Sequence, residues 1–102
     1  MADAERVALA VSELATNLVR YAQEGTIVLS SVAGSAGTGI QVESWDVGPG
    51  IADLEQALED GFSTGGGLGS GLPAVRRLMD EFTIATGPSG TRIVVRTWAT
   101  NR

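Results

Sequence analysis

The feature that most constrains this chain is a glycine-rich segment, residues 61–71, in which glycine takes more than half of the positions. Glycine weakens the interior of a helix or a strand, so this density is incompatible with either element. The segment instead offers backbone N–H groups without side chains, shortly before Pro73, which can begin a helix. Such a backbone can bind an anion, phosphate above all, and a flexible Gly/Ser linker is the competing interpretation.

Composition narrows the classes of function. A chain of 102 residues with 43% hydrophobic and 19% charged residues is expected to form one folded domain with one core. The net charge of −5 argues against nucleic-acid binding, and the apolar runs are too short to suggest a membrane span. The chain has no cysteine, which excludes disulfides and thiolate chemistry and is compatible with a cytoplasmic location.

Two further residue types are missing. Without lysine there is neither a P-loop nor the strand lysine of ordinary protein kinases. Without histidine there is no Ser-His-Asp catalysis, no histidine to accept a phosphoryl group, and few ways to bind zinc. A nucleotide, if this chain binds one, is therefore held by another device.

Hydrophobic periodicity predicts helices and strands on both sides of the glycine-rich segment. Residues 3–22 are predicted to form an amphipathic helix, which Gly25 is expected to end. Strands are predicted over 26–32 and 40–45, a short helix over 52–60, and a closing hairpin with strands 83–86 and 91–98. A further helix is predicted from Pro73 to about residue 81, with an apolar face of Val75, Leu78, Met79 and Phe82. This order predicts an α+β two-layer sandwich, with helices on one face of a mostly antiparallel mixed sheet.

Polar residues and glycines recur at the ends of these predicted elements. Glu13 and Asn17 are four residues apart on the first helix, so their side chains are neighbours at the edge of its apolar stripe. Asp46 follows the second strand and precedes Gly48 and Gly50. Taken singly, Glu13 and Asn17 are most often a solvated helix flank, and Asp46 is explained equally well as the start of a turn.

Together, these segments resemble a known superfamily. SELATN at residues 12–17, DVGPGI at 46–51 and GGGLGSGL at 65–72 resemble the three nucleotide-binding boxes of the GHKL ATPase/kinase superfamily. DGFSTGGGLG at 60–69 and GLPAVRRLMDEF at 71–82 resemble its anti-sigma-factor-like serine/threonine kinases of the RsbT type, the switch kinases of the bacterial stressosome. The resemblance implies one GHKL-type domain over residues 1–102 with the Bergerat ATP-binding fold. That family usually has a strand and a helix ahead of the first box. The fold of this chain is expected to lack both.

The resemblance also implies roles for individual residues. Asp46 would accept a hydrogen bond from the exocyclic amine of adenine, and Gly48 and Gly50 would let the backbone approach the base and ribose. Thr91 would help to hold the adenine, directly or through water, although a threonine at the start of a strand is also an ordinary β-favouring residue.

The phosphate end of the site follows from the same resemblance. Asn17 would bind Mg²⁺ through its carbonyl oxygen, and Glu13 would be the catalytic general base that deprotonates the attacking serine. Backbone N–H groups of the glycine-rich segment would cradle the phosphates of ATP. The nucleotide-binding set is completed by Ile51, Ser63, Thr64, Gly65, Gly66, Gly67, Leu68, Gly69, Ser70, Gly71 and Leu72.

The function implied by the resemblance is that of an ATP- and Mg²⁺-dependent protein serine/threonine kinase. Its substrate would be a serine of a STAS-domain antagonist protein in a stress-signalling partner switch, with a stressosome scaffold and a PP2C-type phosphatase as further partners. The alternative is a nucleotide-gated, anti-sigma-like binding module with little or no catalysis. A Rossmann site at GSGLPA, residues 69–74, is rejected because no strand directly precedes it.

Overall fold

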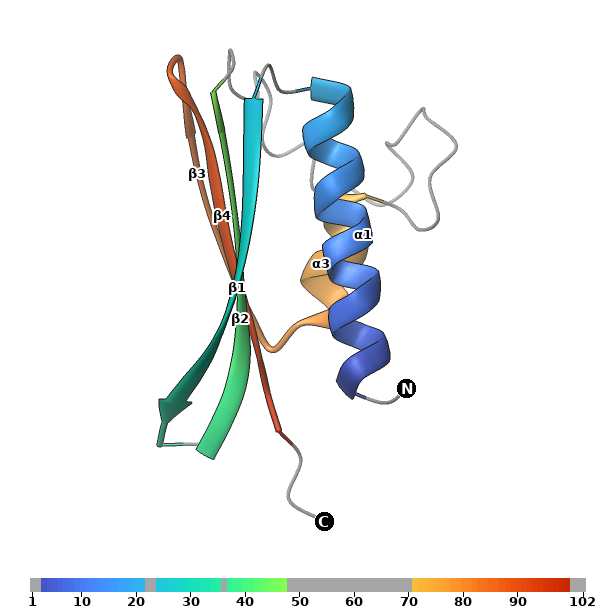
Figure 1. Ribbon diagram of the computed structural model, residues 1–102, viewed down its shortest axis with the longest axis vertical. Helices are drawn as coiled ribbons and strands as arrows, with labels where there is room; N and C mark the ends of the chain where they lie inside the picture. The colour runs from blue at the N-terminus through green and yellow to red at the C-terminus, as the bar shows by residue number, and fades with distance from the viewer. Residues whose placement is uncertain (1–2, 22–23, 36, 48–70, 100–102) are drawn as a thin grey trace.

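The computed structural model describes residues 3–21, 24–35, 37–47 and 71–99, and the statements below concern these residues. The described elements are, in chain order, α1 (Asp3–Tyr21), β1 (Glu24–Gly34), β2 (Gly37–Val47), α3 (Leu72–Leu78), β3 (Glu81–Gly87) and β4 (Gly90–Trp98). Both helices lie on the same face of a twisted sheet (Figure 1). The helix predicted over 52–60 lies outside the described residues.

The sheet has four strands in the order β1-β2-β4-β3, and each neighbouring pair is antiparallel. Each half of the sheet is a hairpin, and β4 joins the halves by pairing with β2, as Val42 opposite Val95 shows. The end of β2 and the start of β4 therefore lie side by side at one end of the sheet. The predicted α+β class and the antiparallel pairing of the described strands are confirmed.

The core lies between the sheet and the two helices. In β2, Val42 and Ser44 are buried while Trp45 is exposed, so the predicted alternation is confirmed over Val42–Trp45, whereas Ile40 and Gln41 are both half-buried. Leu14 of α1, Val75 of α3 and Ile93 of β4 are nearly inaccessible to solvent and belong to the same cluster. Burial of each such side chain contributes about 1.5–3 kcal/mol to folding.

Two predicted boundaries were wrong. Gly25 does not end the first helix but lies within β1, opposite Asp46, where an added Cβ would come within 2.8 Å of Leu18 Cδ2. A side chain at this position would require Leu18 to shift, so glycine suits the close packing of α1 on the strand. Phe82 lies in β3 and not in α3, because the helix ends at Leu78 and Met79 is already extended. Pairing of Phe82 with Val95 outweighs the helical spacing that suggested a longer helix.

A charged cluster ties both helices to the sheet. Arg6 of α1 donates to the backbone oxygen of Leu78 at 3.2 Å, where α3 ends, and to Thr97 Oγ1 of β4 at 2.8 Å. Asp80 accepts a hydrogen bond from the backbone N–H of Trp98 at 2.7 Å. These contacts fix the position of α1 over the sheet and satisfy a carbonyl at the carboxyl end of α3. Among the described helices, none is both long and apolar enough to cross a membrane.

Candidate functional site

A fixed carboxylate lies at the end of the sheet where β2 stops. We call this region, formed by Asp46, Gly90 and Thr91, the carboxylate edge. The pairing of Trp45 with Arg92 brings Asp46 next to Thr91. The backbone N–H of Thr91 donates to Asp46 Oδ1 at 3.1 Å, and Thr91 itself is only 6% exposed. A carboxylate has about four lone-pair positions, so one bond from Thr91 orients Asp46 and leaves acceptor capacity for a ligand.

Glycine at position 90 makes this arrangement possible. Gly90 has φ 146°, in the region that favours glycine, and an added Cβ would overlap the backbone oxygen of Asp46 and lie 3.4 Å from its Oδ1. Any side chain there would push the end of β2 away from the start of β4. Gly90 therefore allows Asp46 and Thr91 to approach each other.

The hydroxyl group of Thr91 contacts the hydroxyl group of Thr86 on β3. Thr86 lies opposite Thr91 in the β3–β4 ladder, and their Oγ1 atoms are 2.7 Å apart. Thr86 was not among the residues predicted from the sequence. The signal for it was the hairpin itself, because a register that closes on Gly87 and Gly90 pairs these two threonines.

Glu13 and Asn17 lie in the carboxyl-terminal half of α1, which runs beside the edge of the sheet where β2 ends (Figure 1). Their spacing of four residues places both on one side of the helix. Asn17 is half-buried, as expected for the edge of an apolar stripe, but Glu13 is only 4% exposed. Glutamate is seldom buried to this degree, so its position marks it as a candidate functional group.

The phosphate-binding prediction is only partly covered by the described residues. Gly71 precedes α3 with φ 70°, and its backbone oxygen accepts from the N–H groups of Ala74 and Val75 at 3.1 and 3.2 Å. Leu72 is 5% exposed and packs in the core, so only its backbone is available to a ligand. Pro73 lies in the first turn of α3 as predicted. The other predicted nucleotide-binding residues lie outside the described part of the chain, both those predicted near the base and ribose and those of the glycine-rich segment: Gly48, Gly50, Ile51, Ser63, Thr64, Gly65, Gly66, Gly67, Leu68, Gly69 and Ser70.

The oxygen ligands that the protein offers fit a Mg²⁺ ion that is bound together with the phosphates of a nucleotide. Within the described residues no group of three or more histidine, cysteine, aspartate or glutamate side chains gathers into a metal site. Asn17 offers one amide oxygen. Mg²⁺ commonly keeps several waters and binds through one or two protein ligands plus substrate phosphates, so this sparse set is suited to a magnesium nucleotide.

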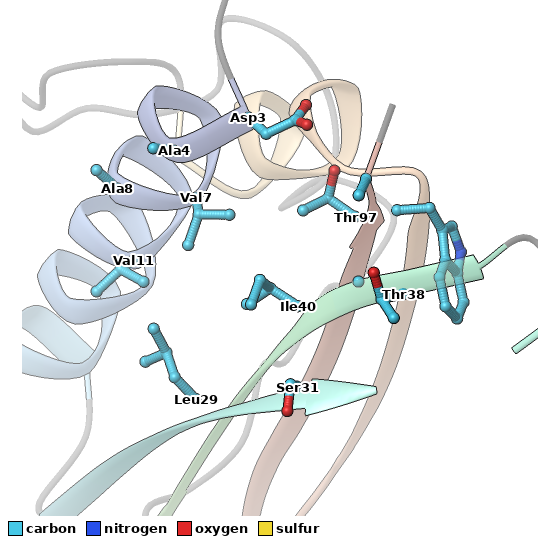
Figure 2. A pocket seen from close by; sticks show the side chains of 13 residues that line it. Asp3, Ala4, Val7, Ala8, Val11, Leu29, Ser31, Thr38, Ile40 and Thr97 are labelled. Atoms are coloured by element: carbon cyan, nitrogen blue, oxygen red, sulfur yellow. The ribbon is translucent and has the colours of Figure 1, made fainter. Parts of the chain in front are cut away.

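An apolar groove lies at the opposite end of the central strands. Its volume is about 810 Å³, and Val7 and Val11 of α1 face Leu29 of β1 and Ile40 of β2 across it (Figure 2). The start of β2 and the end of β4 border this groove, whereas Asp46 and Thr91 lie at the end of β2 and the start of β4. The groove and the carboxylate edge are therefore separate features.

Known proteins of one family share this architecture. The sequence-family model of the histidine kinase-like ATPase domain matches residues 1–97 of this chain. The chain is 46% identical to the serine/threonine-protein kinase RsbT of Bacillus subtilis (strain 168) over 97 residues, which cover 94% of this chain and 73% of RsbT. It is 28% identical to the histidine kinase domain from the Erythrobacter litoralis EL346 blue-light activated histidine kinase, with a TM-score of 0.58 over 90% of this chain and 45% of the other.

A more distant structure supports the fold alone. The catalytic domain of histidine kinase ThkA is 21% identical and superposes with a TM-score of 0.68, covering 94% of this chain and 68% of the other. The fold and the family match agree, and the chain belongs to the histidine kinase-like ATPase family. Within that family it is an RsbT-like serine/threonine kinase, which confirms the resemblance inferred from the three sequence boxes.

Proposed function

We propose that the chain binds ATP with the adenine against Asp46 and transfers the terminal phosphoryl group to a serine of a STAS-domain antagonist protein. The observation that carries this proposal is the carboxylate edge, where Thr91 N–H holds Asp46 Oδ1 at 3.1 Å and Gly90 leaves room for the approach. A fixed carboxylate acceptor matches the amine of adenine and repels the carbonyl oxygen of guanine.

The phosphates and the metal would be bound away from Asp46, by Asn17 and the glycine-rich segment. Asn17 would hold Mg²⁺ through its amide oxygen, and backbone N–H groups of residues 65–71 would bind the phosphates. When bound, the metal ion supplies positive charge that offsets the charge developing on the phosphoryl oxygens. Leu72, which is buried in the core, anchors the segment that leads into α3.

Glu13 is the proposed general base. In the transfer, the substrate serine Oγ forms a bond to the terminal phosphorus, the bond from that phosphorus to the bridging oxygen breaks, and Glu13 takes the serine proton. The near-complete burial of Glu13, in the half of α1 beside the carboxylate edge, supports this assignment. This burial keeps bulk water from competing with a bound hydroxyl for the Glu13 carboxylate.

The proposal extends to the setting of the reaction. Residues 1–102 would act as one ATPase/kinase domain in the cytoplasm, within a stress-signalling partner switch. The similarity to RsbT supports the STAS-domain substrate, a stressosome scaffold and a PP2C-type phosphatase as partners.

The test combines phosphoryl transfer with nucleotide binding. The protein is incubated with radiolabelled Mg-ATP and a purified STAS-domain antagonist, and label on serine is measured for wild type, Glu13→Gln and Glu5→Gln. Glu5 is an exposed glutamate of the same helix and serves as the matched control. Glu13→Gln should lower transfer by at least about 100-fold while ADP affinity stays unchanged. Undiminished labelling by Glu13→Gln would remove Glu13 from the mechanism, and wild type that binds ATP without transfer would favour the nucleotide-gated binding module.

A further inference from the structure

We infer that Thr86 is a positioning residue for base selection: its hydroxyl directs the proton of Thr91 toward the purine held by Asp46. This inference rests on the proposed function, because it names what selects the base in that same site. It depends on the hydrogen bond between the hydroxyl groups of Thr86 and Thr91, which has no role in the proposed function so far.

The geometry links Thr86 to the carboxylate edge through one intermediate residue. Thr86 Oγ1 and Thr91 Oγ1 are 2.7 Å apart, and the backbone of Thr91 holds Asp46 Oδ1 at 3.1 Å. Thr91 is 6% exposed and Thr86 is half-buried, so neither hydroxyl is surrounded by bulk water. A hydrogen bond between two shielded hydroxyl groups restricts where each proton points.

Proton counting shows why the second hydroxyl matters. Each hydroxyl has one proton, so one threonine donates to the other. When Thr86 donates to Thr91, the proton of Thr91 remains for the ligand; when Thr91 donates to Thr86, Thr91 presents only lone pairs.

Adenine and guanine require opposite arrangements. Adenine offers a ring nitrogen acceptor beside its amine donor, whereas guanine offers a ring N–H donor beside a carbonyl oxygen. Asp46 accepts from the adenine amine, and Thr91 donates to the adjacent ring nitrogen, directly or through one water. With Thr86 as donor to Thr91, the edge presents one acceptor and one donor in the order that adenine needs. Thr86 therefore adds to the preference for adenine without touching the base.

Calorimetric titration of three nucleotides into single-residue variants tests the inference. The variants are Thr86→Val, which keeps the shape and removes the hydroxyl, and Thr86→Ser, which keeps the hydroxyl. The control is Thr83→Val, the same change at an exposed position of the same strand, where Thr83 lies opposite Val94. The ligands are ADP, GDP and purine riboside diphosphate, whose ring keeps the nitrogen acceptor and lacks the amine. Urea unfolding of each variant checks that the fold is retained.

Without Thr86, the proton of Thr91 is no longer held toward the purine, so Thr86→Val should bind ADP about 3- to 10-fold more weakly, with GDP affinity unchanged, and the ADP/GDP ratio should fall by the same factor. Thr86→Ser and Thr83→Val should bind ADP within about twofold of wild type. With purine riboside diphosphate, Thr86→Val should keep its loss, whereas Asp46→Asn should bind it about as well as wild type does, because its partner amine is missing.

Other results would overturn the inference. Wild-type ADP affinity in Thr86→Val, or an equal loss of ADP and GDP, would mean that Thr86 has only a structural part in the hairpin. A loss in Thr83→Val as large as that in Thr86→Val would have the same meaning. If wild type itself shows no preference for ADP over GDP, the proposed function fails first and this inference with it; that result is recognised before any variant is measured.

Discussion

The two ends of the central strands carry similar groups and use them differently. At one end Asp46 accepts from the backbone N–H of Thr91, and at the other Asp80 accepts from the backbone N–H of Trp98. Arg6 lies 4.0 Å from Asp80 Oδ1, whereas no arginine of the described residues forms an ion pair with Asp46. A carboxylate whose charge is matched within the protein holds elements together, and one oriented but left unmatched can bind a ligand. We therefore propose that the ends of β2 and β4 divide ligand binding and stability between them.

The largest effect is expected where the carboxylate edge has least space. Gly90→Ala should lower the free energy of unfolding by about 3 kcal/mol, because the Cβ would overlap the backbone of Asp46 and alanine disfavours this positive φ. Gly37→Ala is the matched control, since Gly37 also has positive φ, 112°, but an added Cβ meets no atom within 4 Å. Urea denaturation measures both. Equal destabilisation of the two variants would show that backbone conformation alone, and not contact with Asp46, requires glycine at 90.

The next effect separates the two carboxylates directly. Asp46→Asn should weaken ADP binding about 10- to 100-fold, because a charged acceptor is lost, and change stability by less than about 1 kcal/mol. Asp80→Asn should do the reverse, with reduced stability and unchanged ADP affinity. Calorimetry and urea unfolding of both variants make the comparison. If both substitutions lower affinity alike, the division between the ends is wrong.

A moderate effect is expected in the charged cluster. Arg6→Met should cost about 2 kcal/mol of stability, since the hydrogen bonds to Leu78 and Thr97 are lost while the aliphatic packing is kept. Arg20→Met changes an exposed arginine of the same helix and should have almost no effect. Chemical denaturation gives the two values, and ADP affinity should stay constant in both. Reduced ADP affinity in Arg6→Met would mean that the position of α1 at this end affects the distant site.

The smallest effect is expected for the hydroxyl inside that cluster. Thr97 accepts from Arg6 at 2.8 Å and donates to Asp80 Oδ2 at 3.2 Å, and it is 2% exposed. Thr97→Val keeps the shape and should cost about 1 kcal/mol, because Arg6 retains Leu78 and Asp3 as partners. A melting temperature equal to that of wild type would place the stabilising role of the cluster on Arg6 and Leu78 alone.

Local patterns predicted much of this molecule. The alternation along β2 and the apolar stripe of α1 identified their buried faces, because burial in a two-layer fold follows the period of each element. The boxes of residues 12–17 and 46–51 pointed to the family and to Asp46. The sequence did not predict that Glu13 would be almost fully buried, since the depth of a residue at the edge of a stripe depends on what packs beside it.

Features that depend on contacts between distant segments were not predictable in this way. Gly25 looked like a helix stop, whereas in the structure it pairs with Asp46 in β1 and packs against Leu18. Phe82 suited both a helical and an alternating pattern, and the β3–β4 register decided between them. The pair Thr86 and Thr91, and the contacts of Arg6 with Leu78 and Thr97, arise from that register and from the docking of α1.

The most direct test of the central claim, that the purine lies against Asp46, is a ¹H–¹⁵N NMR titration of the isotope-labelled protein with Mg-ADP. The backbone amides of Asp46, Gly90 and Thr91 should show the largest shifts among the residues of β2 and β4, with Thr38, Gly39 and Trp98 nearly unchanged. Shifts centred on Thr38, Gly39 and Trp98, at the apolar groove, with the amide of Thr91 unmoved at saturation, would contradict the account.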